Sequence, residues 1–157
     1  MQLFETAQYE VARKAVPAQL IGGIRMTGRY QDCGKAFGTL GRKLNRHIGG
    51  KALTLYYDGE YKETDADFEP AMPVKCSLKI DGICVRELPG CEWLTLMHKG
   101  PYEELGRSYR RMFGYLRQRE LKLDLPTREV YRKGPGMIFK GNPNNYLTEI
   151  QFPVAAS

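Results

Sequence analysis

The segment 145–154, NYLTEIQFPV, has the alternating pattern of a strand with one buried face. One row of alternate residues is apolar at Ile150 and Phe152, whereas the other row places Glu149 beside Gln151. We expect the apolar row to face the core and the Glu149 row to face the opposite side of a sheet. An acid in the middle of such a strand is either a solvent-facing charge or a contact for a ligand, and the rest of the sequence bears on this choice.

The chain carries one sequence pattern twice. Residues 16–44 align with residues 88–116 at a constant offset of 72. This offset superimposes residues of the same class: Pro17 on Pro89, Gly28 on Gly100, Tyr30 on Tyr102, Phe37 on Tyr109 and Leu44 on Leu116. Further along, FEPAMPV (68–74) aligns with TEIQFPV (148–154) at an offset of 80, so Glu69 falls on Glu149. The constant offset indicates an internal duplication.

Each half is predicted to contain two strands joined by a proline turn, then a helix, then two more strands. The first half is expected to use strands 10–16, 19–26, 52–57 and 68–74, and the second half strands 83–88, 92–98, 128–132 and 148–154. The helix of the second half, 102–119, carries an apolar stripe at Leu105, Tyr109, Met112 and Leu116, and that of the first half at Phe37, Leu40 and Leu44.

These elements predict an α+β protein that forms a single domain over residues 1–157, with one half at about 9–75 and the other at about 82–154. Each half is expected to be an antiparallel sheet with its helix on one face. Two such halves can join across a pseudo-twofold axis, which would leave a ligand groove at the seam.

Composition narrows the classes of protein to which the chain can belong. The 157 residues carry a formal net charge of +6, but the basic residues are mostly scattered and no DNA- or RNA-binding motif is visible. No apolar run is long enough to span a membrane, and the N-terminus lacks the pattern of a secretory signal. The four cysteines have no metal-binding spacing, which favours free thiols in the cytoplasm, without metal or cofactor.

Three motifs, HKGPYEELGRSY (98–109), REVYRKGP (128–135) and YLTEIQFPV (146–154), resemble those of the GyrI-like effector-binding domain, also called the bacterial transcription activator effector-binding domain. The segment PAQLIGGIRMTGRY (17–30) fits the same family, and the resemblance covers about residues 9–154. It implies a duplicated fold with a ligand groove between the halves, and binding of drug-like molecules that are often cationic and aromatic. It also implies that the acid of the T-E-I motif, here Glu149, lies in the groove.

The resemblance leaves three functions open. Some members of the family are the sensor part of transcription regulators, others are stand-alone, and some of these hydrolyse reactive cyclopropane-containing natural products. We favour a stand-alone sensor or sequestering protein, because a groove with one acid suffices for binding but is an incomplete catalytic description. A hydrolase would use Glu149 as general acid or base, with Tyr57, Tyr131 or Tyr102 as proton donor. The third hypothesis is a gyrase-inhibitor-like protein that binds another protein.

Two segments depart from the resemblance. No DNA-binding module precedes Tyr9, so we expect no direct DNA binding by this chain, while a protein partner or a homodimer stays open. The loop 133–145, KGPGMIFKGNPNN, is rich in glycine and proline and is apolar in its middle. Its residues Met137, Ile138 and Phe139 form either a lid, a partner contact or an ordinary packed loop.

Strand alternation selects neighbours for Glu149. If Leu94 and Leu96 face the helix, then Trp93 and Met97 point away from it, toward the side of Glu149. A tryptophan beside a carboxylate suits a flat cation, although Trp93 is also expected in a core between the halves. The candidate ligand-binding residues are therefore Glu149, Trp93, Tyr57, Tyr131, Leu147 and Met97.

The other candidates depend on the duplication. Tyr57 and Tyr131 are assigned equivalent places in the two halves, where they either wall the groove or are edge-strand residues with solvated hydroxyls. Glu69 is interpreted as a structural repeat of Glu149 rather than as a second active acid. A carboxylate at position 149 that is partly removed from water has a raised pKa unless a cation or a hydrogen-bond donor pairs with it.

Overall fold

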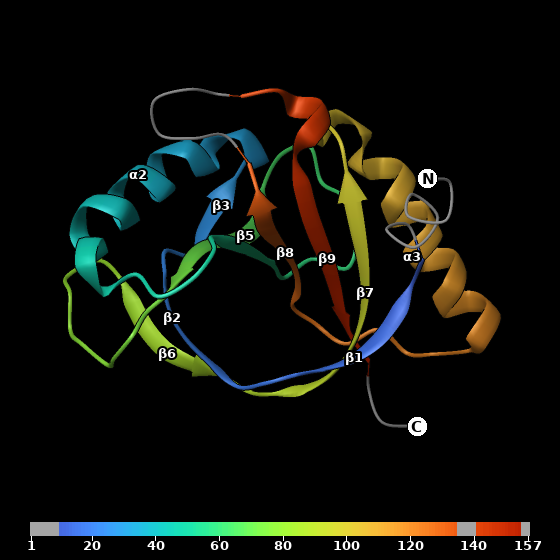
Figure 1. The fold of residues 1–157 in the computed structure, drawn as a ribbon, viewed down its shortest axis with the longest axis horizontal. Helices are drawn as coiled ribbons and strands as arrows, with labels where there is room; N and C mark the ends of the chain where they lie inside the picture. Colours follow the sequence, from blue (N-terminus) through green and yellow to red (C-terminus); the bar gives the residue numbers. More distant parts are fainter. Residues whose placement is uncertain (1–9, 135–140, 155–157) are drawn as a thin grey trace. The chain divides into compact units, whose positions relative to one another are not determined.

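The computed structural model describes residues 10–134 and 141–154, which form two compact units. The N-terminal unit is Val16–Cys91, and the C-terminal unit combines the chain before Val16 with the chain from Glu92 onward. Each unit contains antiparallel strands and, among its described residues, one α-helix (Figure 1). The predicted α+β class is therefore confirmed, whereas the pseudo-twofold axis and the groove between the halves stay predictions.

The N-terminal unit contains a sheet with the strand order β4–β5–β2–β6, in which β3 also pairs with β5. Its elements are β2 (Gln19–Gly23), β3 (Met26–Gly28), α2 (Cys33–Leu44), β4 (Leu53–Tyr56), β5 (Ala66–Pro73) and β6 (Cys84–Leu88), with short 3-10 turns at η1 (Tyr30–Asp32) and η2 (Asn45–His47). Leu40 and Leu44 of α2 pack with Val74 and Ile83 in the core of this unit.

The predicted strand 19–26 is wrong in one respect, because the structure divides it into β2 and β3. The register runs from Gly23 opposite Ala71 to Met26 opposite Phe68, so the break lies opposite Pro70. The backbone N–H of Ile24 donates to the carbonyl oxygen of Pro70 at 3.0 Å. A proline has no N–H to return this bond, so the ladder is interrupted there.

The C-terminal unit contains a sheet with the strand order β1–β7–β9–β8. Its elements are β1 (Ala12–Val16), β7 (Cys91–Lys99), η3 (Tyr102–Glu104), α3 (Leu105–Arg119), β8 (Thr127–Lys133), η4 (Pro143–Asn145) and β9 (Leu147–Pro153). The strand orders of the two units match element for element, because β4, β5, β2 and β6 correspond to β8, β9, β7 and β1. The predicted duplication therefore appears as a repeated topology.

The first strand of each predicted half does not join the sheet of its own half. The strand β1 precedes the N-terminal unit in the sequence but pairs with β7, and β6 precedes β7 in the sequence but pairs with β2. Each unit therefore takes an edge strand from the sequence of the other half. The alignment of the halves carries no information on this exchange, because it compares positions and not pairings.

The core of the C-terminal unit lies between its sheet and α3. Leu94, Ile150 and Phe152 pack against Met112 and Leu116, and all five side chains are buried. The prediction that alternate residues of β7 and β9 face the helix is therefore confirmed. Glu120 caps the C-terminal end of α3: its backbone is left-handed (φ 53°), and its N–H donates to the carbonyl oxygens of the last turn.

Within the described residues, neither helix is long and apolar enough to cross a membrane. The predicted lid residues Met137, Ile138 and Phe139 lie outside the described residues.

Candidate ligand-binding face

Glu149 is buried on the side of the C-terminal sheet that faces away from α3, with 5% of its surface exposed. Its Oε1 accepts hydrogen bonds from Arg132 Nη2 at 2.7 Å and from Gln151 Nε2 at 2.6 Å. Lys14 Nζ lies 3.4 Å from the other oxygen, Oε2. The partners come from β8, β9 and β1, so the carboxylate is not the solvent-facing charge that an isolated strand would present.

A β-bulge places Arg132 over this carboxylate. In β8, Tyr131 lies opposite Thr148 and Lys133 lies opposite Leu147, so Arg132 is an additional residue on its strand. A bulge turns a side chain out of the regular alternation. The sequence shows no bulge at this position, which is why Arg132 was missed as a partner of Glu149.

These contacts decide the protonation state of Glu149. Burial alone would raise its pKa, but the hydrogen bonds from Arg132 and Gln151 and the charges of Arg132 and Lys14 outweigh burial, and the pKa lies below its ordinary value. The sequence predicted a raised pKa only for a carboxylate without a partner, and Glu149 has partners. Glu149 is therefore an ionised, paired group at neutral pH.

Met97 is the cross-strand neighbour of Glu149, and Leu147 lies opposite Lys99 on the same pair of strands. Both Met97 and Leu147 are half-buried. Trp93 lies opposite Pro153, four residues along the strand from Glu149, which is about 13 Å between backbones. Glu149, Met97, Leu147 and Trp93 thus share one face, but Met97 and not Trp93 is next to the acid.

Trp93 is buried beneath a basic side chain of the same unit. The guanidinium carbon of Arg128 lies 4.0 Å from the centre of the Trp93 ring, a cation–π contact. Arg128 lies opposite Gln151 in the sheet, so it belongs to the face that carries Glu149. The indole Nε1 of Trp93 has no hydrogen-bond partner among the described residues. The sequence predicted that the Trp93 ring would meet a cationic ligand, whereas in the structure Arg128 lies over this ring.

Tyr131 lies on the other face of the C-terminal sheet. It stands opposite Thr148, in the row that faces α3, and its hydroxyl donates to Glu129 Oε1 at 3.2 Å. The hydroxyl of Tyr109 from α3 donates to the second oxygen of Glu129. The tyrosine is therefore separated by the sheet from Glu149, with which the sequence had grouped it.

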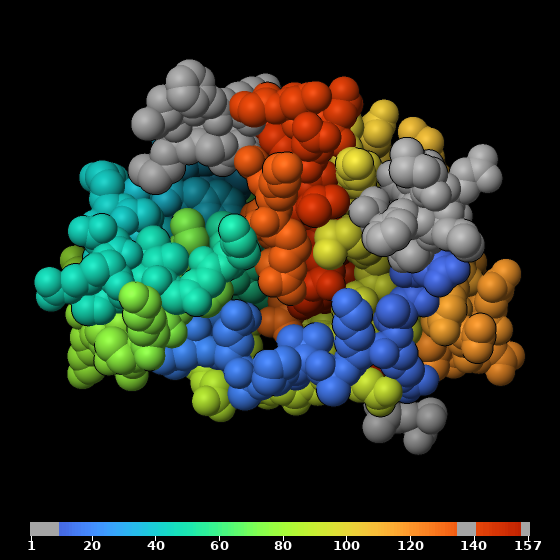
Figure 2. Space-filling view, in the orientation of Figure 1, coloured from blue at the N-terminus to red at the C-terminus, as the bar shows by residue number. Residues whose placement is uncertain are grey.

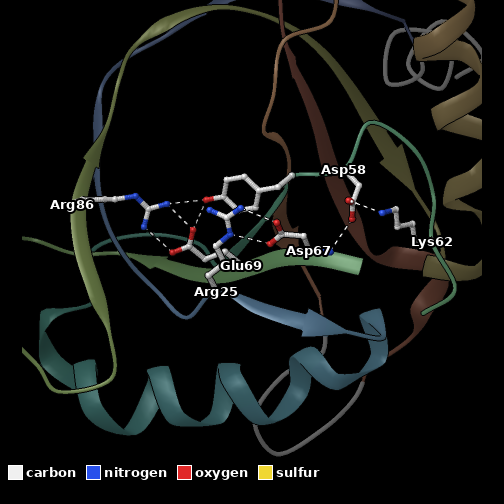
Figure 3. Close-up of polar contacts among 7 residues, drawn as sticks. Arg25, Asp58, Lys62, Asp67, Glu69 and Arg86 are labelled. Atoms are coloured by element: carbon white, nitrogen blue, oxygen red, sulfur yellow. Dashed lines mark hydrogen bonds and ion pairs between the residues drawn. The ribbon is translucent and has the colours of Figure 1, made fainter. Parts of the chain in front are cut away.

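Tyr57 belongs to the N-terminal unit, where a second buried glutamate, Glu69, has its own set of partners (Figure 3). Glu69 is 1% exposed and accepts from Tyr57 at 2.6 Å and from the two Nη groups of Arg86 at 2.6 and 2.7 Å. The guanidinium of Arg25 lies over the Tyr57 ring at 3.7 Å and pairs with Asp67 through two hydrogen bonds.

The backbone at Gly23 lies so close to Glu69 that any side chain at this position would have to displace the carboxylate. A Cβ atom at this position would lie 2.2 Å from Glu69 Oε2. The glycine in β2 therefore leaves the space in which the carboxylate meets Arg86.

The two glutamates are held in corresponding ways. The offset of 72 places Lys14 on Arg86, and each of these basic residues pairs with the glutamate of its unit from an edge strand. The counterpart of Tyr57 at the second glutamate is Arg132, so the predicted equivalence of Tyr57 with Tyr131 is wrong. The offset would have found Lys14 and Arg86, whereas Arg132 and Gln151 carried no such signal.

Figure 2 shows where the strands of the C-terminal unit reach the surface. Atoms of β8 (orange), β9 (red) and β7 (yellow-green) are visible next to those of β1 (blue), in the order in which these strands pair. The surface atoms therefore include parts of the three strands that carry the partners of Glu149 and of β7, which carries its cross-strand neighbour Met97.

Comparison with the sequences of curated proteins gives no match. Among solved structures, the C-terminal domain of EcmrR is 28% identical to this chain with a TM-score of 0.83, and the alignment covers 95% of this chain and 99% of that one. EcmrR in a complex with DNA gives the same TM-score at 26% identity, and there the alignment covers 99% of this chain and 62% of the longer EcmrR chain.

Two more distant structures share the fold. SAV2435 bound to tetraphenylphosphonium is 18% identical with a TM-score of 0.67, and the alignment covers 94% of each chain. A hydrolase from Listeria innocua is 14% identical with a TM-score of 0.66, and the alignment covers 98% of this chain and 96% of that one.

The sequence also matches a family as a whole. The match extends over residues 9–155 and so includes both duplicated halves, both buried glutamates and the partners that hold them. This chain belongs to the family of GyrI-like small molecule binding domains, which are related to the effector domains of transcription regulators.

Proposed function

We propose that this chain is a sensor or sequestering module that binds an aromatic small molecule on the face of the C-terminal sheet that carries Glu149, Met97, Leu147 and Trp93. The observation that supports it most is the content of this face. A buried tryptophan, whose indole N–H has no partner in the described part of the chain, lies in one sheet with a buried carboxylate, and half-buried apolar side chains lie beside that carboxylate. Apolar surface with a few convergent polar groups is typical of small-molecule sites.

The comparisons support the aromatic character of the ligand. SAV2435, a protein with the same fold, has been solved with tetraphenylphosphonium, a molecule of four phenyl rings. We carry over the aromatic part of that ligand as a proposal for this chain. The cytoplasm is proposed as its compartment, as expected for a relative of regulator domains.

Hydrolysis is less well supported by the geometry. A general acid or base at Glu149 would have to exchange a proton near neutral pH, but Arg132 and Gln151 hold its pKa below the ordinary range. Of the three tyrosines that the sequence offered as proton donors, Tyr57, Tyr131 and Tyr102, the structure shows Tyr131 donating to Glu129 on the other face of the sheet and Tyr57 donating to Glu69. The described residues present no observation that favours a gyrase-inhibitor-like role.

The single tryptophan of the chain provides the test. Titration with tetraphenylphosphonium, naphthalene-2-sulfonate and 2-naphthol should change the fluorescence of Trp93 saturably for at least one of the three. Met97→Ala removes apolar contact area beside Glu149 and should weaken that ligand about tenfold, from roughly 1.5 kcal/mol of lost burial.

Tyr131→Phe is the matched control, because it keeps a ring and removes a hydroxyl on the other face of the same sheet. This variant should bind as the wild type does. The proposal fails if no member of the panel binds saturably, or if Tyr131→Phe weakens binding as much as Met97→Ala does.

A further inference from the structure

The carboxylate of Glu149 is outnumbered by its basic partners. Among the described residues, two basic side chains, Lys14 and Arg132, pair with this one carboxylate. A ligand that enters this face therefore meets an excess of positive charge, although the resemblance to the family led us to expect a site for cations.

The neighbouring acids of the C-terminal unit do not correct this excess. Glu92 Oε1 pairs with Arg13 Nε at 2.9 Å, and both side chains are about half exposed. Glu129 lies in the row that faces α3 and accepts from Tyr109 and Tyr131. Among the described residues, neither of these carboxylates pairs with Lys14 or Arg132.

We infer that the ligand of this face carries an anionic group, such as a carboxylate, sulfonate or phosphate, that Arg132 and Lys14 bind together. The inference rests on the proposed function, since it names the chemical class of the ligand for the same site. The anionic group would lie beside Glu149 and bridge the two basic side chains, while the aromatic part of the ligand contacts Met97 and Leu147.

Arg132 and Lys14 have the exposure and the hydrogen-bonding capacity that this role needs. Their side chains are 44% and 55% exposed, in contrast to the buried carboxylate between them. Among the described residues, Arg132 donates to Glu149 through Nη2 alone. A guanidinium carries five N–H donors in a planar fork that matches an anion with two oxygens, so donors of Arg132 remain for a ligand.

Two buried polar atoms on the same face indicate which further hydrogen-bonding groups the ligand carries. The N–H of Trp93 lacks an acceptor among the described residues, and Gln151 Oε1 lacks a donor. The role of the Gln151 oxygen is well defined, because the amide nitrogen of this residue donates to Glu149. An aromatic acid with a further hydroxyl or amino group would supply both a donor and an acceptor.

A cation on this face would meet the opposite situation. Glu149 already has Arg132 at 2.7 Å and Lys14 at 3.4 Å, so a cationic ligand must displace one of them or approach a carboxylate that is already neutralised. Like charges at close range oppose such binding.

The experiment uses two probes of the same shape and opposite charge, tetraphenylborate and tetraphenylphosphonium. Their dissociation constants are measured by titration calorimetry and by Trp93 fluorescence on the full chain at low and moderate salt. Tetraphenylborate should bind at least tenfold more tightly than tetraphenylphosphonium, and the difference should shrink as salt screens the basic groups.

Arg132→Met should weaken tetraphenylborate about tenfold and leave tetraphenylphosphonium unchanged or slightly tighter, and Lys14→Met should act in the same direction. Glu149→Gln removes the only carboxylate that contacts these basic groups among the described residues, and should strengthen tetraphenylborate severalfold. The matched control is Arg13→Met, which removes one positive charge from the same strand as Lys14 but pairs with Glu92. Circular dichroism checks that each variant is folded.

Each outcome decides a different statement. Tighter binding of tetraphenylphosphonium would overturn the anionic ligand and leave the proposed function intact. Equal effects of Arg132→Met and Arg13→Met would overturn the assignment of Arg132, because only net charge would then matter. Failure of tetraphenylborate and of naphthalene-2-sulfonate to bind would overturn the anionic site, and the proposed function fails as well if 2-naphthol and tetraphenylphosphonium also do not bind.

Discussion

Arg86→Met is expected to destabilise the protein by about 3 kcal/mol, because it leaves the buried carboxylate of Glu69 without its cation. Glu69 is 1% exposed and accepts from both Nη groups of Arg86, at 2.6 and 2.7 Å. In the variant, Tyr57 is the remaining partner that the structure shows for this carboxylate.

The magnitude follows from the exposure of the two partners. Removal of one member of a buried ion pair costs about 3–5 kcal/mol. The Arg86 side chain is 33% exposed, so water can enter part of the space it leaves, and the lower end of that range applies. The double variant Glu69→Gln with Arg86→Met buries no charge and should be more stable than Arg86→Met alone by about 1–2 kcal/mol.

The assay is urea unfolding of the four proteins of this double-mutant cycle, followed by circular dichroism. Arg25→Met serves as the matched control, because Arg25 also contacts Tyr57 but forms its ion pair with Asp67. The side chains of Arg25 and Asp67 are 55% and 35% exposed. This control should cost about 0.2–1 kcal/mol. The reasoning is refuted if Arg86→Met costs no more than Arg25→Met, or if the second substitution destabilises the protein further.

Other consequences can be checked with the same unfolding assay. Gly23→Ala should cost about 1–3 kcal/mol, because its methyl group would displace Glu69 from its partners; unchanged stability would show that the carboxylate can move. Glu120→Gly should stabilise the protein by about 0.5–1 kcal/mol, since glycine adopts the left-handed backbone at the end of α3 without strain, and a loss of stability would contradict this. The lowered pKa of Glu149 implies a contribution to stability that is present above about pH 4.5 and is lost as the pH falls through the lower folded-state pKa. Glu149→Gln should therefore lose less stability than the wild type between neutral and acid pH, and parallel profiles would count against the pairing.

Local pattern was sufficient for much of the fold. The alternation in NYLTEIQFPV placed Ile150 and Phe152 against the helix, and the spacing of Met112 and Leu116 placed them on its buried stripe. Such predictions succeed because the side-chain direction in a strand or helix depends on neighbours in the sequence. The constant offsets within the chain likewise predicted the repeated order of elements and the correspondence of Glu69 with Glu149.

The break between β2 and β3 could be predicted from the sequence only in part. Pro70 was visible, but the strand that it would interrupt depended on which residue lay opposite, and that residue is Ile24. The bulge at Arg132 carried no comparable signal, because it is defined by the register of β8 against β9.

The sequence by itself determined the repeated elements, their buried rows and the family, because these depend on local periodicity and on short motifs. Only the tertiary structure decided what each glutamate contacts, because all the partners except Gln151 lie outside the glutamate's own strand. Lys14 and Glu149 are 135 residues apart, and they meet because β1 pairs with the sheet of the other half. The sequence led us to expect that Glu149 binds a cationic ligand. In the structure, Glu149 is an ionised group that is already paired with Arg132 and Lys14, and this finding changed the charge that we propose for the ligand.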